Sequence, residues 1–382
     1  MGQMKPKGYR YYEELLDHLG NDESIFFNGQ FVYPRQFEIH LPANHIRHCE
    51  CNCLHCQGKY LNQSLGIWEL DAIELLTKLQ GAIPRHIYGG AYTEPLMNPY
   101  LMTFLGLTKR YNNHFGIHTN GILLNQLEEN YGWLTELNRI STDKIDYISV
   151  SMDAGLPWTW HKEKKAKTHK MFYEVIDGLK KTCDIRDKCE SPSHAIRMCY
   201  LITEETDSWE DITSIVAIAK SMKLDSLRFS IPYAPYNQDF GDVKKYEDER
   251  KESLREEKCY EMIQPYLSKD LNEKPYIFFV KPETTDVEQY DFNICGYGYF
   301  QITYGADGYV YKCSAAATPT AKQCRIGKIT ADLDEFKQII MKNYDKDFDC
   351  KKMCFAKGVR CNRMAIIINQ KIEEKLKEIN NE

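Results

Sequence analysis

Three cysteines near the start of the chain have the spacing of a metal centre. Cys49, Cys53 and Cys56 form a C-x3-C-x2-C pattern on one short segment, HCECNCLHCQG. Three thiolates on a tight loop bind three irons of a cubane cluster and leave the fourth iron open for chemistry. A zinc site or a simple electron-transfer cluster needs a fourth ligand close by, which Cys51 or His55 would have to supply. The spacing favours an iron–sulfur cluster over zinc.

A second group of cysteines follows a long stretch that is poor in them. Of the 14 cysteines, four lie within residues 49–56 and six within residues 295–361. This count is large for a chain of cytosolic character, whose thiols stay reduced, so two metal-binding regions are expected. Cys295 and Cys313 flank two aromatic, alternating runs joined by GADG, which predicts a β-hairpin. The remaining cysteines are expected to be small apolar or idle surface side chains, namely Cys183, Cys189, Cys199 and Cys259.

Strands and helices are predicted to alternate through the first two thirds of the chain. Six runs rich in β-branched or aromatic residues have the character of strands, at residues 36–41, 85–88, 115–118, 146–150, 195–202 and 226–231. Apolar residues with helical spacing lie between them, at residues 73–79, 101–111, 171–183 and 209–222. Alternation of this kind implies an α/β fold with a parallel sheet. Six such repeats predict a partial (β/α)6 TIM-like barrel.

Polar side chains follow the first four predicted strands. The cysteine segment comes after the first strand, and the next three ends carry Gly89, Gly90 and Glu94, then Asn120, then Ser149, Ser151 and Asp153. Taken singly, two glycines are typical of a turn, Thr-Asn-Gly of a loop and Ser-x-Asp of a helix cap. In parallel barrels, however, the chemistry lies on the loops at the carboxyl ends of the strands. The order of these residues therefore predicts one site on one rim.

On these residues the chain resembles the radical S-adenosylmethionine (SAM) superfamily. The usual signature is C-x3-C-x-aromatic-C, and Cys49, Cys53, His55 and Cys56 occupy its positions, with His55 in place of the commoner Tyr or Phe and Cys51 as an additional cysteine. The resemblance covers roughly residues 36–235 and implies a [4Fe-4S] cluster that cleaves SAM to a 5′-deoxyadenosyl radical, which abstracts hydrogen from a substrate. It also implies a reductant such as flavodoxin or ferredoxin.

The same resemblance implies roles for the side chains on the rim. Gly89 and Gly90 with Glu94 look like the glycine-glycine-glutamate motif that binds the methionine amino group of SAM, although three residues are inserted before the acid. Glycines allow close backbone approach, and a carboxylate pairs with an ammonium group. Asn120 matches a residue found at the end of the third strand in many members. Positions that often contact the ribose or the methionyl carboxylate are matched by Ser149, Ser151 and Asp153.

The second cysteine region resembles the SPASM or twitch domain of one radical SAM subgroup, which binds an auxiliary [4Fe-4S] cluster. Cys295, Gly308 and Cys313 fit its opening, and IGKI at residues 326–329 fits the strand that follows. The later C-x3-C-x6-C departs from the two-cluster pattern. One auxiliary cluster is therefore expected, with ligands from Cys295, Cys313 and two of Cys350, Cys354 and Cys361. Two incompletely ligated clusters that include Cys324 are the alternative, and a zinc ribbon is a third possibility.

Four segments are expected in the chain of 382 residues. They are an N-terminal helical extension over residues 1–35, the barrel over 36–235, a charged linker or helical segment over 236–290, and an auxiliary-cluster domain over 291–382 that ends in an amphipathic helix at 364–382. The linker is inferred from its charge, KKYEDERKESLREEK. Internal repeats are not evident in the sequence.

Composition narrows the classes of partner. A formal charge of −6 and a pI near 6.0 provide no field for holding a polyanion, so bulk nucleic-acid binding is not expected. One basic run, residues 162–170, is expected to be a solvated loop or helix start. The N-terminus lacks the features of a secretory signal, and no stretch reaches the roughly 18 apolar residues of a membrane span. A cytoplasmic chain with no membrane partner is expected.

The sequence alone does not identify the class of substrate. Resemblance to the SPASM group points to modification of a peptide or protein, but the 48 residues before Cys49 show no separate peptide-recognition domain. A small substrate such as an aminosugar, nucleoside or amino-acid derivative is therefore the alternative. A non-catalytic iron–sulfur electron carrier is the alternative outside the enzymes, and the SAM-type motifs argue against it. No catalytic acid or base is assigned, although Arg197, Glu204, Arg228, Tyr233 and Tyr236 lie near the last strand ends.

Overall fold

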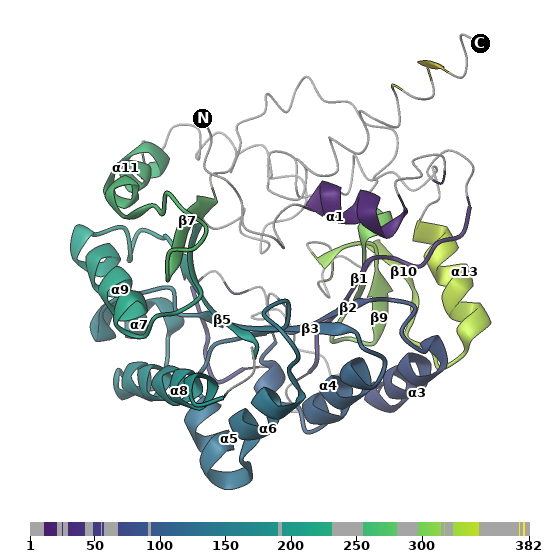
Figure 1. Cartoon of the computed structure of the whole chain (residues 1–382), viewed down its shortest axis with the longest axis horizontal. Helices are drawn as coiled ribbons and strands as arrows, with labels where there is room; N and C mark the ends of the chain where they lie inside the picture. The colour runs from purple at the N-terminus through teal and green to yellow at the C-terminus, as the bar shows by residue number, and fades with distance from the viewer. Residues whose placement is uncertain are drawn as a thin grey trace.

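One continuous sheet organises the described part of the chain. The computed structural model describes residues 11–20, 25, 30–42, 49–54, 56, 68–90, 93–189, 193–230, 255–280, 297–314, 317, 324–343, 374, 377 and 378. Within these residues ten strands pair in the order β10-β9-β8-β1-β2-β3-β4-β5-β6-β7. The sheet curves, and its helices lie along its outer face (Figure 1).

The six predicted strands are confirmed and are parallel to one another. They are β1 (Gln36–Ile39), β2 (Arg85–Tyr88), β3 (His114–Thr119), β4 (Tyr147–Ser151), β5 (Ala195–Leu201) and β6 (Ser226–Ser230), and they pair in chain order. The predicted α/β class with a partial barrel is therefore correct. Because all six run in one direction, their carboxyl ends meet at one edge of the sheet.

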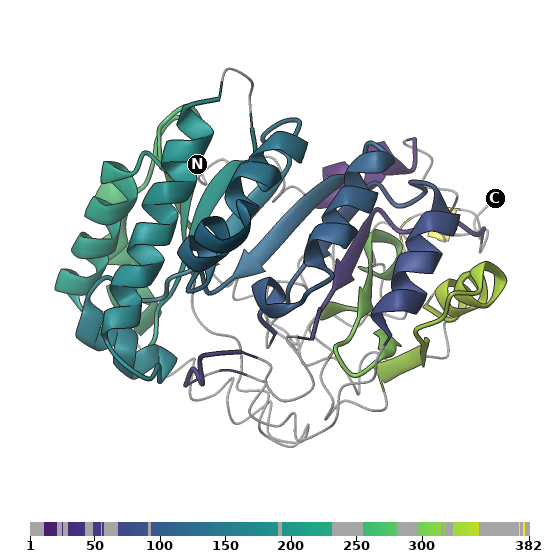
Figure 2. The same ribbon diagram turned by 90° about the horizontal axis from the view of Figure 1, so that it is seen from below.

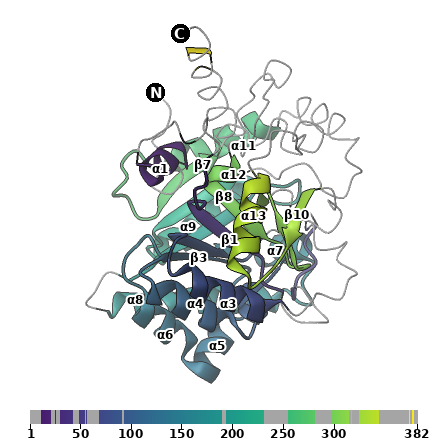
Figure 3. The same cartoon turned by 90° about the vertical axis from the view of Figure 1, so that its right-hand side faces the viewer.

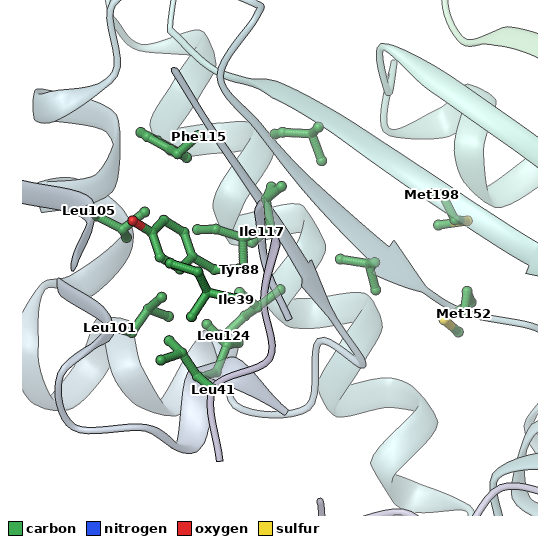
Figure 4. Close-up of a cluster of buried hydrophobic side chains, with 14 of the residues drawn as sticks. Ile39, Leu41, Tyr88, Leu101, Leu105, Phe115, Ile117, Leu124, Met152 and Met198 are labelled. Atoms are coloured by element: carbon green, nitrogen blue, oxygen red, sulfur yellow. The ribbon is translucent and has the colours of Figure 1, made fainter. Parts of the chain in front are cut away.

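Helices cover the outer face of this sheet and bury its alternate side chains. They are α3 (Glu69–Leu79), α4 (Leu101–Arg110), α5 (Leu124–Tyr131), α6 (Trp133–Ile140), α7 (Pro157–Lys164), α8 (Lys170–Asp187) and α9 (Trp209–Ser221). Figure 2 shows them side by side along the sheet. In Figure 4 the Tyr88 ring of β2 lies with Leu101 and Leu105 of α4, and Tyr88 and Leu105 are fully buried. No helix in the described ranges is long and apolar enough to cross a membrane.

A short N-terminal helix contacts the opposite face of the sheet, near the amino ends of the strands. In α1 (Tyr11–His18), Glu14 accepts hydrogen bonds from Arg85 of β2 at 3.3 Å and from Arg35 at 3.4 Å. Arg85 and Glu14 are both almost completely buried. The charges therefore pair with each other away from water, which offsets the cost of burying each one.

The segment predicted to be a charged linker contains a further strand. It includes α11 (Arg255–Ile263), the 3-10 turn η3 (Gln264–Tyr266) and β7 (Tyr276–Val280), and β7 pairs in parallel with β6. The prediction was wrong for β7 because the charged run before it dominated the composition. The sequence of the strand, YIFFV, is apolar and long enough for a buried strand.

The C-terminal hairpin extends the same sheet. β8 (Gln301–Tyr304) and β9 (Tyr309–Tyr311) are antiparallel, as GADG predicts, and Gly308 between them has φ +81°. β8 also pairs in parallel with β1, and β10 (Arg325–Lys328) pairs with β9. The short helix α12 (Tyr297–Phe300) precedes β8, and α13 (Leu333–Asn343) follows β10 and lies beside it (Figure 3).

The hairpin and the barrel share one hydrophobic core. The ring of Phe37 in β1 lies 4.4 Å from that of Tyr304 in β8 and 5.9 Å from that of Phe336 in α13. All three side chains are fully buried. The predicted helix at residues 364–382 falls outside the described residues apart from Glu374, Lys377 and Glu378, which are helical.

The turn after β4 generates a testable prediction about packing. A Cβ atom on Gly155 would lie 2.1 Å from the carbonyl oxygen of Asp211, whereas Gly106 on α4 has nothing within 4 Å. Gly155→Ala should therefore lower the free energy of unfolding by about 1 to 3 kcal/mol, as overpacking against backbone does. Gly106→Ala should raise it by about 0.5 to 1 kcal/mol, because alanine is the better helix former. Urea denaturation of both variants checks this, and equal midpoints would contradict it.

Candidate functional site

The cysteine loop lies beyond the carboxyl end of β1, and the thiols of Cys49, Cys51 and Cys53 lie together. Hydrogen bonds with Cys49 and Cys53, together with burial, raise the pKa of the Cys51 thiol above its ordinary value. The Cys51 amide also donates to the Cys49 sulfur at 3.4 Å, and the Cys56 amide donates to the Cys53 carbonyl at 3.1 Å. Cys51 is partly buried against the main core. His55, predicted at the aromatic position, lies outside the described residues.

Asn120 joins the end of β3 to this loop. Its side-chain amide donates to the Cys49 sulfur at 3.2 Å and to a Glu50 carboxylate oxygen at 3.4 Å. Its own side-chain oxygen accepts from the amide of Ile122 at 2.9 Å, which fixes its orientation. Two predicted site residues, Asn120 after β3 and Cys49 after β1, are therefore in direct contact.

Glu94, which follows β2, is held by the protein on both carboxylate oxygens. One oxygen accepts from the Thr119 hydroxyl at 2.6 Å and from the Leu96 amide at 3.1 Å, and the other accepts from the Asn120 amide at 2.7 Å. Glu94 also caps the 3-10 turn η2 (Pro95–Met97). Its side chain is 1% exposed, and burial raises its pKa from 4.5 to about 7.

The two glycines after β2 are required by packing within the rim. Gly89 has φ +97°, and a Cβ atom there would lie 2.3 Å from the carbonyl oxygen of His118. A Cβ atom on Gly90 would lie 2.1 Å from the ring of His40, the residue that follows β1. These contacts explain both glycines by close approach of protein atoms, so their contact with SAM stays a prediction.

The residues predicted at the end of β4 have separate partners. The Ser149 hydroxyl lies 3.1 Å from the Cys199 sulfur of β5, and Ser151 is half-buried at the last position of β4. Asp153 has φ +57°, accepts a hydrogen bond from the Leu201 amide at 2.9 Å and forms an ion pair with Lys164. One Asp153 oxygen is thus bound to β5 and the other to a cation, so its predicted contact with SAM also stays a prediction.

Lys164 is a site residue that sequence reasoning missed. It lies in the basic run expected to be solvated, yet its side chain is only 3% exposed. Burial by itself would lower its pKa, but the charges of Asp153, Cys53 and Cys51 raise it above the ordinary value. The prediction failed at this residue because the neighbouring Lys162 and Lys165 are exposed, and the run of charges gives no local sign that Lys164 faces inward.

The inside of the barrel carries an aromatic and cationic group below the rim. The Arg197 guanidinium lies 3.9 Å from the centre of the Tyr147 ring, and the Tyr147 hydroxyl is 2.9 Å from Nε2 of His118. Arg197 is thus placed by stacking on an aromatic face. Arg228 is half-buried on β6 and Glu204 is exposed, while Tyr233 and Tyr236 lie outside the described residues.

The donor set of the loop fits an iron–sulfur cluster. Four thiols occur within residues 49–56, and the side-chain amide of Asn120 donates to one of the sulfurs. Thiolates are the ligands that such clusters prefer, and hydrogen bonds to sulfur are typical of their surroundings. Cys49, Cys53 and Cys56 would hold the cluster, with Cys51 as an additional thiol at the same place.

The second cysteine region is described in part. Cys324 is 2% exposed and packs with Tyr311 and Ala317 in a small cluster, against which Cys313 also packs. The cluster lies at the end of the hairpin, next to β9 and β10. Four further predicted ligands fall outside the described residues, namely Cys295, Cys350, Cys354 and Cys361.

The parallel sheet, the cysteine loop after β1 and the C-terminal hairpin define a partial α/β barrel with a small C-terminal extension. No family model matches the chain. No curated protein matches it either. The likeness is therefore found in the tertiary structure.

Solved structures with bound S-adenosylmethionine share this fold. SuiB from Streptococcus suis bound to S-adenosylmethionine aligns with a TM-score of 0.53 and 12% identity, over 86% of this chain and 70% of that one. SuiB bound to the precursor peptide SuiA gives 0.52 and 12%, over 91% and 72%. The native enzyme anSMEcpe with bound AdoMet gives 0.51 and 15%, over 86% and 90%. At these identities the likeness is one of fold.

The buried Glu94 carboxyl generates a prediction about pH. Because its pKa is raised from 4.5 to about 7, the native state keeps a proton that the unfolded chain releases near pH 4.5. The contribution of Glu94 to stability therefore falls as the pH rises from about 4.5 to 7 and is constant above that. Over this range the loss is about 3 kcal/mol.

Glu94→Gln removes the titration, so its free energy of unfolding should fall less between pH 5 and pH 8 than that of the wild type. Chemical denaturation of the iron-free protein at both pH values measures this difference. Glu210→Gln, a change at an exposed carboxylate on α9, is the matched control and should follow the wild type. Identical pH dependence in all three proteins would show that Glu94 is not protonated in the native state.

Proposed function

We propose that this chain is a radical SAM enzyme in which Cys49, Cys53 and Cys56 bind a [4Fe-4S] cluster. One observation carries the proposal: Asn120, from the end of β3, donates a hydrogen bond to the Cys49 sulfur at 3.2 Å. The residues that resemble a SAM site and those that resemble a cluster site are thus in contact at one edge of the sheet. An electron carrier has no use for the first of these two groups.

A [4Fe-4S] cluster held by Cys49, Cys53 and Cys56 would supply the electron for reductive cleavage of bound SAM, the chemistry that provides a 5′-deoxyadenosyl radical for hydrogen abstraction. The part of the protein is to bind the cluster and to orient the cofactor. Asn120 donates to a cluster thiolate, and Glu94 fixes the Asn120 backbone at 2.7 Å. Gly89, Gly90, Ser149, Ser151 and Asp153 complete the proposed cofactor surface, with His55 at the signature position. A flavodoxin or ferredoxin is the proposed electron donor.

The first test is cleavage of SAM. The anaerobically reconstituted wild type should form 5′-deoxyadenosine from SAM and dithionite, measured by liquid chromatography and mass spectrometry. The triple variant Cys49→Ala, Cys53→Ala, Cys56→Ala should form none, because the loop then has only one thiol. Exposed Cys189→Ala is the control and should match the wild type. A wild type that binds iron on the loop and yet forms no 5′-deoxyadenosine would refute the proposed enzymatic activity.

A peptide is the proposed class of substrate. SuiB is known bound to the precursor peptide SuiA, and anSMEcpe, at a TM-score of 0.50 and 15% identity, is known bound to the Cp18Cys peptide. These are facts about those proteins, and they support a peptide or protein substrate here. A small molecule such as an aminosugar, nucleoside or amino-acid derivative is the alternative. A gene for a short precursor peptide beside the gene of this chain, followed by a mass change of that peptide on incubation, separates the two.

An auxiliary [4Fe-4S] cluster is proposed for the segment over residues 291–382, with Cys295, Cys313 and two of Cys350, Cys354 and Cys361 as ligands. Hence Cys313→Ala should lower the iron content of the reconstituted chain from about eight to about four per molecule. Cys324→Ala should leave about eight, because a thiol buried among apolar side chains is typically structural. Iron and sulfide analysis measures both. Loss of iron in Cys324→Ala would instead support a ligand set that includes Cys324.

A further inference from the structure

The last turn of α7 supports the middle of the cysteine loop. The amide of Asn52 donates to the Lys164 carbonyl at 2.9 Å, and the amide of Leu54 donates to the Glu163 carbonyl at 3.0 Å. These two loop residues lie on either side of Cys53. The free carbonyls at the end of a helix thus find partners in the loop, and the loop gains a fixed position relative to α7.

The Lys164 side chain adds a buried positive charge at the same place. It is 3% exposed and pairs with Asp153, which is 8% exposed. Asp153 is itself fixed by the Leu201 amide at 2.9 Å. Among the thiols, Cys53 and Cys51 are the ones whose charges act on Lys164. The ammonium group is therefore paired with one carboxylate, while the backbone carbonyl of the same residue accepts a hydrogen bond from the cysteine loop.

The buried charge of Lys164 would change the reduction potential of a cluster on the loop, and elementary electrostatics predicts the direction of this change. A cubane with three thiolates carries one more negative charge after it takes up an electron, so a nearby cation stabilises the reduced form more than the oxidised form. The effect is large where water is excluded. The carboxyl end of α7, whose carbonyls point at the loop, acts in the opposite sense, because it carries partial negative charge. Asp153 also opposes the cation.

We propose that Lys164 is a positioning residue of the cysteine loop whose buried ammonium group raises the reduction potential of the loop cluster, and that Asp153 limits this effect. The inference rests on the proposed function, since it requires a cluster on Cys49, Cys53 and Cys56. It assigns the pair a role in how readily the cluster accepts an electron from its reductant. It does not require Lys164 or Asp153 to touch SAM.

The test is a redox titration of the reconstituted full chain without SAM, followed by the electron paramagnetic resonance signal of the reduced loop cluster. Lys164→Met should lower the midpoint potential, because the cation is lost. Asp153→Asn should raise it, because the cation is then unopposed. A purely structural role of the pair would not move the potential in opposite directions. The triple cysteine variant supplies the signal of any auxiliary cluster for subtraction.

Two further variants separate the effect of the charge on the potential from an effect on folding. Lys164→Arg keeps the charge and should stay close to the wild-type potential. If Lys164→Met does not fold, because it leaves Asp153 buried and unpaired, the double variant Lys164→Met, Asp153→Asn replaces it. The potential of the double variant should lie below that of Asp153→Asn.

Equal potentials in Asp153→Asn and the double variant would overturn the inference. A change in the affinity for SAM with no change in potential would also overturn it, and would assign Lys164 to the cofactor instead. If the wild type shows no signal beyond that of the triple cysteine variant, the loop binds no cluster. In that case the proposed function fails, and its failure is recognised separately from that of the inference.

Discussion

Parallel pairing of β1 to β6 is the constraint on which the site depends. Since each of these strands pairs in parallel with the next one along the chain, all six carboxyl ends lie at the same edge of the sheet. The cysteine loop, Glu94, Asn120 and Asp153 each follow a different strand, and they meet because the strands agree in direction. A single antiparallel strand in this series would send its polar end to the far edge.

Buried polar and charged groups connect the strand ends to one another. Glu94 accepts hydrogen bonds from Thr119, Asn120 and Leu96, and so ties the end of β2 to the end of β3. The pair of Asp153 and Lys164 ties β4 and β5 to α7 and, through the backbone of α7, to the cysteine loop. A buried polar or charged group without a partner would be costly at such positions, so each group holds its partners in place. The rim is thereby ordered by contacts within the protein.

The C-terminal region is built onto the same sheet. Pairing of β8 with β1 places the hairpin directly beside the strand that leads to the cysteine loop, and the rings of Phe37, Tyr304 and Phe336 form a common core. Of the cysteines in this region, Cys313 and Cys324 lie next to β9 and β10 and are therefore joined to the barrel through the sheet itself.

The sequence by itself determined the six strands, the hairpin around GADG and the order of polar residues after the strands, because these depend on local periodicity and turn chemistry. Tertiary structure decided the partners. Lys164 appears solvated in a run of lysines, and only the approach of α7 to the loop buries it against Asp153. Strand β7 was hidden by the charged residues before it. The enclosure of Glu94 and the packing of Cys313 near Cys324 likewise arise from segments that are distant in the chain, and no local pattern encodes such contacts.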